Sequence, residues 1–222
     1  MAILLIRHGE TEGNRTRVIQ RPDIPLSERG LDQAGRLAER LRTSPIDEIW
    51  SSPLARARMT ADALSRATGV AVREQGELEE RNLGDLRGTA YVDLDFDPFE
   101  PDYVPPGGES WTVFYGRVDR VWEQVERRWF DHFARRAPDR HLAVVSHGLF
   151  LRSLIERRLL GPEERAAHEA RHGDFRLGNT ALTIVAPQGS EPGRSPHRLE
   201  LLACTAHLDE APLGDVGTLR IA

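Results

Sequence analysis

Lysine is absent from this sequence, because all thirty basic residues among its 222 are arginine. Any contact to an anion must therefore come from guanidinium groups, imidazoles, hydroxyls or the backbone, and guanidinium favours planar, bidentate contacts to oxyanions. The formal net charge of -5 also lacks the clustered positive excess that nucleic-acid binding requires. We therefore expect no nucleic-acid partner.

Cysteine and long apolar runs are scarce as well. The single cysteine, Cys204, excludes an intramolecular disulfide, and its apolar run 199–205 predicts a buried, inert thiol in a reducing compartment. No stretch approaches the length of a membrane span. The apolar run near the N-terminus is too short, and lacks the basic lead-in, for a signal peptide. These features predict a cytoplasmic protein with no membrane partner.

The remaining composition is that of an ordinary folded protein. Hydrophobic residues make up 39% of the chain and charged residues 29%, which is enough to bury a sizeable core. Strand-like and helix-like periodicities alternate along the chain. Strands are expected at 2–6, 46–50, 70–73, 142–145, 180–186 and 199–205, and helices at 31–41, 54–64, 111–133 and 148–160. The alternation predicts a three-layer α/β/α sandwich with a mostly parallel central sheet, in a single domain spanning residues 1–222.

Two segments lack regular periodicity. Residues 84–110 are rich in Asp and Pro, which predicts an ordered loop or cap over the site, and residues 188–198 are typical of a surface loop. In contrast, residues 111–133 carry apolar and aromatic side chains at helical spacing, which favours core packing over a ligand-stacking role. The same stripe would also suit a subunit contact, so a homodimer is possible.

Two histidines stand where predicted strands end. Arg7-His8-Gly9 follows the apolar run 2–6, and Ser146-His147-Gly148 follows the run 142–145. Parallel strands end at the same edge of a sheet, where α/β proteins place their ligands. A histidine between an always-charged arginine and a permissive glycine suits a nucleophile in an anion pocket. Both histidines are therefore expected to face one site.

Further motifs follow in series along the chain. They are Asn14, Gln20, the segments 23–27 and 51–57 with Arg56, Glu80 before Gly84, the segment 106–110, and Asn179-Thr180. In this order and spacing the sequence resembles the histidine phosphatase superfamily, the phosphoglycerate-mutase-like clan, over nearly the whole chain. The resemblance implies a phosphoglycerate-mutase-like fold and phosphoryl transfer through a phosphohistidine, with neither a metal nor a cofactor.

The resemblance assigns roles to individual residues. His8 would be the nucleophile, whose neutral imidazole attacks phosphorus and splits one difficult displacement into two. Neutrality at one ring nitrogen requires an acceptor at the other, so we expect a backbone carbonyl beside His8. Arg7, Arg56 and a protonated His147 would surround the phosphoryl oxygens. Further phosphate contacts are expected from Asn14, Gln20 and Gly148.

The leaving alkoxide needs a proton, which a carboxylic acid of raised pKa in a desolvated pocket can supply. Glu79 and Glu80 both qualify by residue type. The family's acid stands four residues before a glycine, which favours Glu80 before Gly84. The sequence thus predicts a phosphomonoester hydrolase that acts on a small phosphorylated metabolite.

A cofactor-dependent phosphoglycerate mutase is the main alternative. Mutases of this clan carry basic residues in a longer cap, whereas residues 88–108 here hold five acidic residues and no arginine. Such a cap is expected to repel a second anionic group on the substrate, which favours the phosphatase. A noncatalytic phosphate-binding module on the same fold is also conceivable, although every catalytic position is retained.

One competing motif points to different chemistry. His168-Glu169-Ala170-Arg171-His172 matches the H-E-x-x-H pattern of zinc peptidases. Its neighbours are mostly charged, as on a solvated helix, and no third ligand has a motif of its own, although His197 and His207 stay open. A zinc metallopeptidase is therefore a remote alternative.

Overall fold

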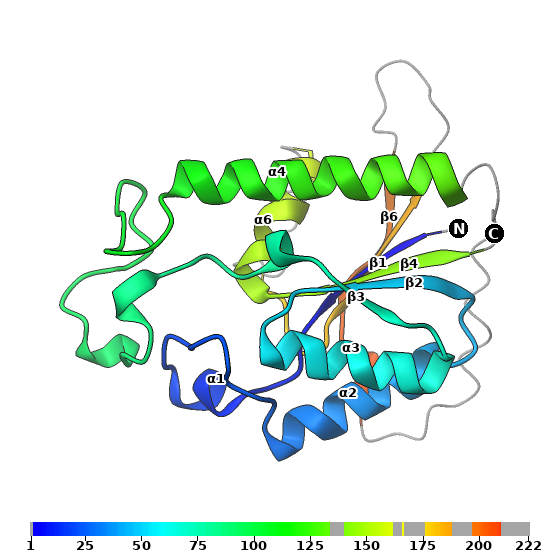
Figure 1. Ribbon diagram of the computed structural model, residues 1–222, viewed down its shortest axis with the longest axis horizontal. Helices are drawn as coiled ribbons and strands as arrows, with labels where there is room; N and C mark the ends of the chain where they lie inside the picture. Colours follow the sequence, from blue (N-terminus) through cyan, green and yellow to red (C-terminus); the bar gives the residue numbers. More distant parts are fainter. Residues whose placement is uncertain (1, 134–139, 162–165, 167–175, 188–196, 210–222) are drawn as a thin grey trace.

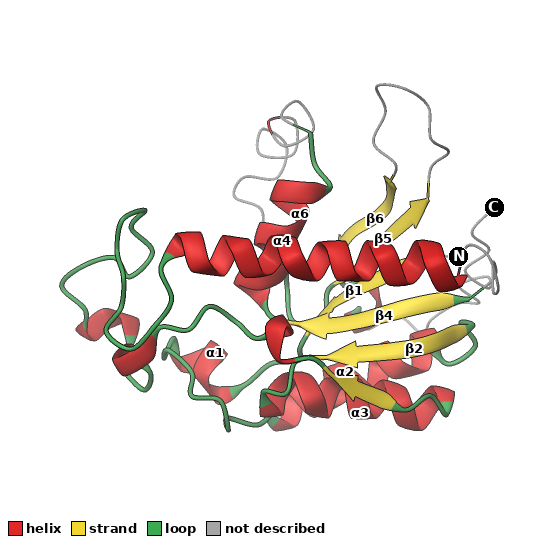
Figure 2. Ribbon diagram, turned by 45° about the horizontal axis from the view of Figure 1, so that its top comes forward, coloured by secondary structure: helices red, strands yellow, loops and turns green. Residues whose placement is uncertain are grey.

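A six-stranded sheet lies between two layers of helices in the computed structural model, which describes residues 2–133, 140–161, 166, 176–187 and 197–209 (Figures 1 and 2). The strands are β1 Ile3–Arg7, β2 Ile46–Ser51, β3 Val72–Glu74, β4 His141–Ser146, β5 Leu182–Pro187 and β6 His197–Cys204. Their order is β3-β2-β4-β1-β5-β6, with β1 to β4 parallel and with β5 and β6 antiparallel to their neighbours. The predicted three-layer sandwich with a mostly parallel sheet is confirmed.

Helices cover both faces of the sheet (Figure 1). They are α1 Glu12–Thr16, α2 Glu28–Leu41, α3 Ala55–Thr68, α4 Trp111–Arg128 and α6 Gly148–Arg158. Alternate residues of the central strands point to opposite faces, so one core cluster forms beneath α4 and α6 and another beneath α2 and α3. Core packing of the aromatic stripe on α4 is confirmed, because Phe114, Trp122 and Trp129 are fully buried.

Local signals fix the ends of several helices. The Ser27 hydroxyl accepts a hydrogen bond from the Gly30 N–H at 3.0 Å and so caps α2. Gly69 ends α3 in the left-handed region, at φ 75°. Because this turn uses the next two residues, β3 begins at Val72 rather than at the predicted position 70. The long helix also ends differently, since α4 passes into a π-helical turn over Trp129–Phe133.

The C-terminal strand differs from its prediction. β6 begins at His197, inside the segment predicted to be a surface loop, and residues 188–196 of that loop lie outside the described residues. Cys204 at its end is only half-buried, and its Sγ accepts a hydrogen bond from Arg40 at 3.3 Å. The prediction of a buried thiol is therefore wrong, because Cys204 ends an edge strand whose residues 199–204 are all only partly buried.

Residues 84–110 form an ordered cap, built from turns and the two short 3₁₀ helices Gly84–Leu86 and Tyr91–Asp93. Arg81, which is buried, holds the cap from inside by donating to the carbonyls of Pro98, Tyr103 and Glu109. Its guanidinium also lies 3.9 Å from the centre of the Trp111 ring. This ordering supports the interpretation of the segment as a cap, while the single-domain boundary 1–222 stays a prediction.

The described part of the chain contains no helix that is both long enough and apolar enough to cross a membrane.

Candidate active site

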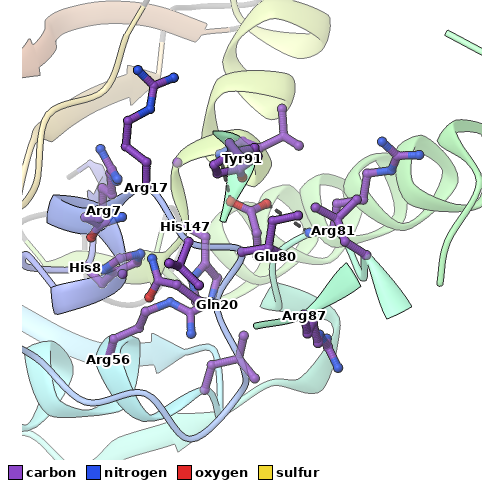
Figure 3. A pocket seen from close by; sticks show the side chains of 18 of the residues that line it. Arg7, His8, Arg17, Gln20, Arg56, Glu80, Arg81, Arg87, Tyr91 and His147 are labelled. Atoms are coloured by element: carbon purple, nitrogen blue, oxygen red, sulfur yellow. Dashed lines mark hydrogen bonds between the residues drawn. The ribbon is translucent and has the colours of Figure 1, made fainter. Parts of the chain in front are cut away.

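His8 and His147 meet at the carboxyl edge of the sheet (Figure 3). β1 and β4 are parallel neighbours whose register pairs Arg7 with Ser146, so the next residue of each strand emerges at the same height. The two imidazole rings are 5.1 Å apart between centroids, at an interplanar angle of 59°. Both side chains are buried. The predicted convergence of the two histidines is confirmed.

The His8 ring is held neutral and in one tautomer. Its Nδ1 lies 2.7 Å from the Gly9 carbonyl oxygen, which can only accept, so Nδ1 carries the proton and Nε2 keeps its lone pair. Burial, followed by the charges of Arg7 and Arg56, lowers the pKa of His8 well below 6.5. The expected backbone acceptor is thus present, and Nε2 is available as a nucleophile.

Arg7 and Arg56 supply fixed positive charge at the cavity. Arg7 donates from Nη1 to the Leu177 carbonyl, and Arg56 donates to the Arg21 carbonyl at 3.2 Å. The Nε of each is buried and has no hydrogen-bond partner within the described ranges. Burial lowers the pKa of Arg56 to about 10, so that guanidinium stays charged at neutral pH. Both side chains therefore retain donors for an anion.

Gly148 contributes by lacking a side chain. A Cβ at this position would lie 3.2 Å from Nε and 3.4 Å from Cζ of Arg7. The glycine at the start of α6 thus lets the arginine guanidinium lie directly against the backbone. Gly148 also lines the cavity, while its phosphate contact stays a prediction.

Two amides face the same cavity. The Oδ1 of Asn14 accepts from the Thr11 N–H at 3.2 Å and from Asn179, and the Oε1 of Gln20 accepts from the Thr11 hydroxyl at 2.9 Å. Since both oxygens are occupied, the NH₂ groups of Asn14 and Gln20 are left to donate. Both residues line the cavity, as predicted, and they do so as donors.

Within the described part of the chain, His147 has one hydrogen-bonded and one free ring nitrogen. Its Nε2 lies 2.8 Å from the Ser52 hydroxyl, while its Nδ1 is buried without a partner in the described structure. Complete burial, followed by the charges of Arg56 and its neighbours, lowers the pKa of His147 well below 6.5. The imidazole is therefore neutral when no anion occupies the cavity. Its protonation beside a bound phosphate dianion, whose charge raises the pKa of an imidazole, stays a prediction.

Glu80 approaches the cavity from the loop before the cap, whereas Glu79 does not line it. The Glu80 carboxylate accepts from the backbone N–H groups of Arg81, Leu149 and Phe150 at 2.9–3.0 Å. Burial raises the pKa of Glu80, although the hydrogen bonds oppose this shift. The structure thus brings together Glu80 and the histidines, as the motif spacing predicts.

The cavity has a volume of about 290 Å³, and its outer wall is basic. Arg17 and Arg87 line it, together with Tyr91 and Phe99 of the cap. None of the five acidic cap residues lines it. The cavity wall that a second anionic group would contact is therefore basic, whereas the repulsion expected from the acidic residues of the cap stays a prediction.

Sequence reasoning gave no role to three residues around the histidines. Ser52 binds His147, and Asn179 and Thr180 both donate to the backbone carbonyl of His8. The Asn179-Thr180 pair was visible as a motif before a late strand. Its contacts depend on chain packing across more than 170 residues, which spacing alone does not reveal.

The zinc motif His168-Glu169-His172 lies outside the described residues. Within the described ranges, no group of three or more His, Cys, Asp or Glu side chains is arranged to hold a metal ion. His197 contacts Glu126 at 2.5 Å and His207 contacts Thr180 at 2.9 Å, so the two candidates for a third ligand have other partners.

Comparison with known proteins gives the same family from sequence and from structure. The sequence profile of the histidine phosphatase superfamily (branch 1) matches residues 3–194. The chain is 36% identical to phosphoglycerate mutase-like protein 4 of Arabidopsis thaliana over 70% of each chain. It is 31% identical to the Yersinia pestis protein named "Probable phosphoglycerate mutase GpmB", over 97% of this chain and 99% of that one.

A solved structure of a mycobacterial glucosyl-3-phosphoglycerate phosphatase in complex with VO₃ has a TM-score of 0.71 and 29% identity. It covers 90% of this chain and 97% of that one. The relatives thus include proteins named as phosphatases and proteins named as mutases. The chain belongs to the histidine phosphatase superfamily, branch 1.

Proposed function

We propose that the protein hydrolyses a small phosphomonoester through a phosphohistidine on His8. The observation that carries this proposal is the neutral, buried imidazole whose Nδ1 is hydrogen-bonded to the Gly9 carbonyl, which leaves the Nε2 lone pair beside the guanidiniums of Arg7 and Arg56. Unassisted hydrolysis of phosphate monoesters is among the slowest known reactions, so charge, alignment and a nucleophile are all required. A cytoplasmic location is part of this proposal.

In the first step, His8 Nε2 attacks phosphorus as the bond from phosphorus to the ester oxygen breaks. Arg7 and Arg56 together match the charge of the transferring group, and their positions are already fixed before the substrate arrives. The NH₂ groups of Asn14 and Gln20, and the free Nδ1 of His147, donate to its oxygens. The step ends with an N–P bond and an alkoxide.

Glu80 handles the protons of both steps. Its pKa is raised by burial, so the protonated acid can give its proton to the alkoxide oxygen and release an alcohol. The resulting carboxylate then accepts a proton from water as that water attacks the phosphohistidine. The N–P bond breaks, orthophosphate leaves, and His8 and Glu80 return to their starting forms.

A phosphoglycerate mutase is the second candidate, and two observations favour it. Relatives with 36% and 31% identity are named as phosphoglycerate mutases or mutase-like proteins. Arg17 and Arg87 also line the cavity, where they can bind a carboxylate on the substrate. The two reactions share the phosphohistidine and differ in whether water or a hydroxyl receives the phosphoryl group. Release of orthophosphate, against transfer to a monophosphoglycerate, separates them.

The test is rapid-quench trapping with a labelled aryl phosphate in EDTA. We expect an acid-labile, alkali-stable phosphoenzyme in the wild type and none in His8→Ala. His141→Asn is the matched control, because His141 is also buried but begins β4 at the opposite edge of the sheet. Turnover that persists in His8→Ala would overturn the nucleophile assignment, and loss of wild-type turnover in EDTA would indicate metal chemistry instead.

A further inference from the structure

The backbone of His8 is held on both sides of the residue. Its N–H donates to the Ser146 carbonyl of β4 at 3.0 Å. Its carbonyl oxygen accepts two hydrogen bonds, one from the Thr180 N–H and one from the Asn179 side-chain Nδ2, each at 3.2 Å. Both donors come from the loop that precedes β5. The peptide groups of the nucleophile therefore cannot shift without breaking contacts to two other parts of the sheet.

The Asn179 amide reaches a second site group at the same time. Its Nδ2 also donates to the Asn14 Oδ1 at 3.2 Å. Both partners can only accept, which fixes the orientation of the Asn179 amide. The Asn179 side chain thus fixes the position of the Asn14 amide relative to the backbone carbonyl of His8.

Thr180 adopts an unfavourable backbone conformation to make this possible. Its φ is 54°, in the left-handed region, which is rare for a β-branched residue and costs free energy. The side chain is fully buried. The turn at Thr180 directs its own N–H and the preceding asparagine side chain toward the same carbonyl. Surrounding contacts must therefore hold this residue in place.

His207 provides such a contact, and its hydrogen-bond directions can be assigned. Arg40 lies 3.3 Å from His207 Nδ1 and can only donate, so Nδ1 accepts and the ring proton is on Nε2. Nε2 then donates to the Thr180 hydroxyl at 2.9 Å, and that hydroxyl donates to the Asn179 carbonyl at 2.7 Å. The chain of donors runs from α2 through the C-terminal segment to the loop beside His8.

We propose that Asn179, Thr180 and His207 are positioning residues that fix the nucleophile, with His207 holding the left-handed turn through the Thr180 hydroxyl. This inference rests on the proposed function, since it assigns these residues to the placement of the His8 ring before attack. The neutral state that the donor chain requires agrees with the pKa of His207, which burial and then Arg40 lower to about 4.

The first test compares Asn179→Ala with Thr183→Val. Thr183 is a buried polar residue on the adjoining strand, and its hydroxyl accepts from the Ala203 N–H at 3.0 Å, but no hydrogen bond joins it to His8. We expect kcat of Asn179→Ala to fall by about 10- to 100-fold, with KM within about 3-fold of wild type, because small misplacement slows attack more than binding. The control should keep wild-type kcat.

The second test separates the hydrogen bond of His207 from its volume. His207→Leu removes the donor to Thr180, whereas His207→Gln keeps an N–H in a similar place. We expect kcat to fall by about 10-fold in the leucine variant and to recover to within about 3-fold in the glutamine variant. Thermal unfolding of all four variants is measured alongside, so that lost stability is distinguished from lost placement.

A third readout does not depend on turnover. The Nδ1 proton of His8, bonded to the Gly9 carbonyl, should give a downfield proton resonance in wild type and in Thr183→Val. We expect it to shift or broaden in Asn179→Ala. An unchanged resonance with wild-type kcat in Asn179→Ala and His207→Leu would overturn the inference. If the wild type forms no phosphoenzyme but the resonance responds as expected, the proposed function fails and the positioning role stands.

Discussion

Charge on the individual side chains of this site follows from burial more than from residue type. His8 and His147 both lie beside guanidinium groups and out of water, and each effect lowers the pKa of an imidazole. Burial in the same cavity has the opposite effect on the carboxyl of Glu80, because it raises that pKa and so favours the protonated form. Burial therefore favours a neutral imidazole at His8 and a Glu80 carboxyl of raised pKa, which are the directions that the proposed two-step phosphoryl transfer requires.

Replacement of the acid tests its role directly. Glu80→Gln should lower kcat for an alkyl phosphate by about 10²- to 10⁴-fold, because the alkoxide no longer receives a proton. The loss should be much smaller for p-nitrophenyl phosphate, whose phenolate leaves unprotonated, if formation of the phosphohistidine limits the rate. Glu79→Gln serves as the control. Steady-state kinetics on both esters measure this, and equal losses on both would contradict the assignment.

The neutral state of His8 is also expected to persist in mild acid. A histidine with an ordinary pKa of 6.5 is about 90% protonated at pH 5.5, whereas the lowered pKa of His8 keeps its ring neutral there. Long-range proton–nitrogen NMR spectra recorded from pH 7.5 to 5.5 should show one unprotonated ring nitrogen for His8 throughout. Its assignment comes from the spectrum of His8→Ala, and a midpoint near 6.5 would be incompatible with the structure.

Strand ends predicted that His8 and His147 meet, and the resemblance to the histidine phosphatases added Arg56 and Glu80 to the same site. They could not predict how those side chains are held. The sequence motif also could not predict that His147 is neutral without a bound anion, because burial is a property of the whole fold. The donors to the His8 carbonyl come from residues 179 and 180, which only sheet order brings near β1.

At the scale of elements, α2 supports the loop that follows β1. A Cβ on Gly30 would lie 2.0 Å from the Glu10 carbonyl oxygen, and one on Gly9 would lie 2.6 Å from the Gly30 carbonyl oxygen. Helix and loop thus touch backbone to backbone just after the nucleophile. This close approach holds the segment that carries the Gly9 acceptor.

Two glycines of α2 form a matched pair for testing this contact. Gly30→Ala should destabilise the fold by roughly 2 kcal/mol or more and lower kcat, since backbone must move. Gly35→Ala, where an added Cβ meets nothing within 4 Å, should stabilise the helix by about 0.5–1 kcal/mol with unchanged kcat. Urea unfolding and steady-state kinetics measure both, and similar stabilities for the two variants would refute the contact.

Element positions were predictable where a signal for a helix end accompanied an apolar periodicity, as with the Ser27 cap of α2 and the Gly69 end of α3. The five-residue helix α1 was not predicted, although it has a capping box of Thr11 and Asn14, because its sequence has no apolar face. The true start of β6 was missed because its first residues pair with the end of β5, which periodicity cannot show.

For the whole molecule, buried neutral histidines make stability depend on pH. His8, His147 and His207 all have folded pKa values below 6.5, so the unfolded chain binds protons first as pH falls. The contribution of these histidines to the free energy of unfolding should be constant above about pH 6.5. It should decrease as the pH falls from there toward the folded pKa values. The raised pKa of Glu80 acts in the opposite direction, because the folded state then binds a proton first.

His207→Gln isolates one of these contributions. Between about pH 6 and 4.5 its free energy of unfolding should depend on pH less steeply than that of wild type, by up to about 1.4 kcal/mol per pH unit. Urea titrations at pH 7.5, 6.0 and 5.0 give the slopes. Identical slopes for wild type and variant would show that His207 titrates normally in the folded chain.

The position of β1 in the middle of the sheet also governs how this protein can be synthesised. β1 is translated first, yet its two neighbours, β4 and β5, begin at residues 141 and 182. A nascent chain therefore carries this apolar strand unpaired until residues 141–146 of β4 have been made, and with one edge still open until residues 182–187 of β5 follow. Partly synthesised chains that end before β4 should accordingly need chaperone protection.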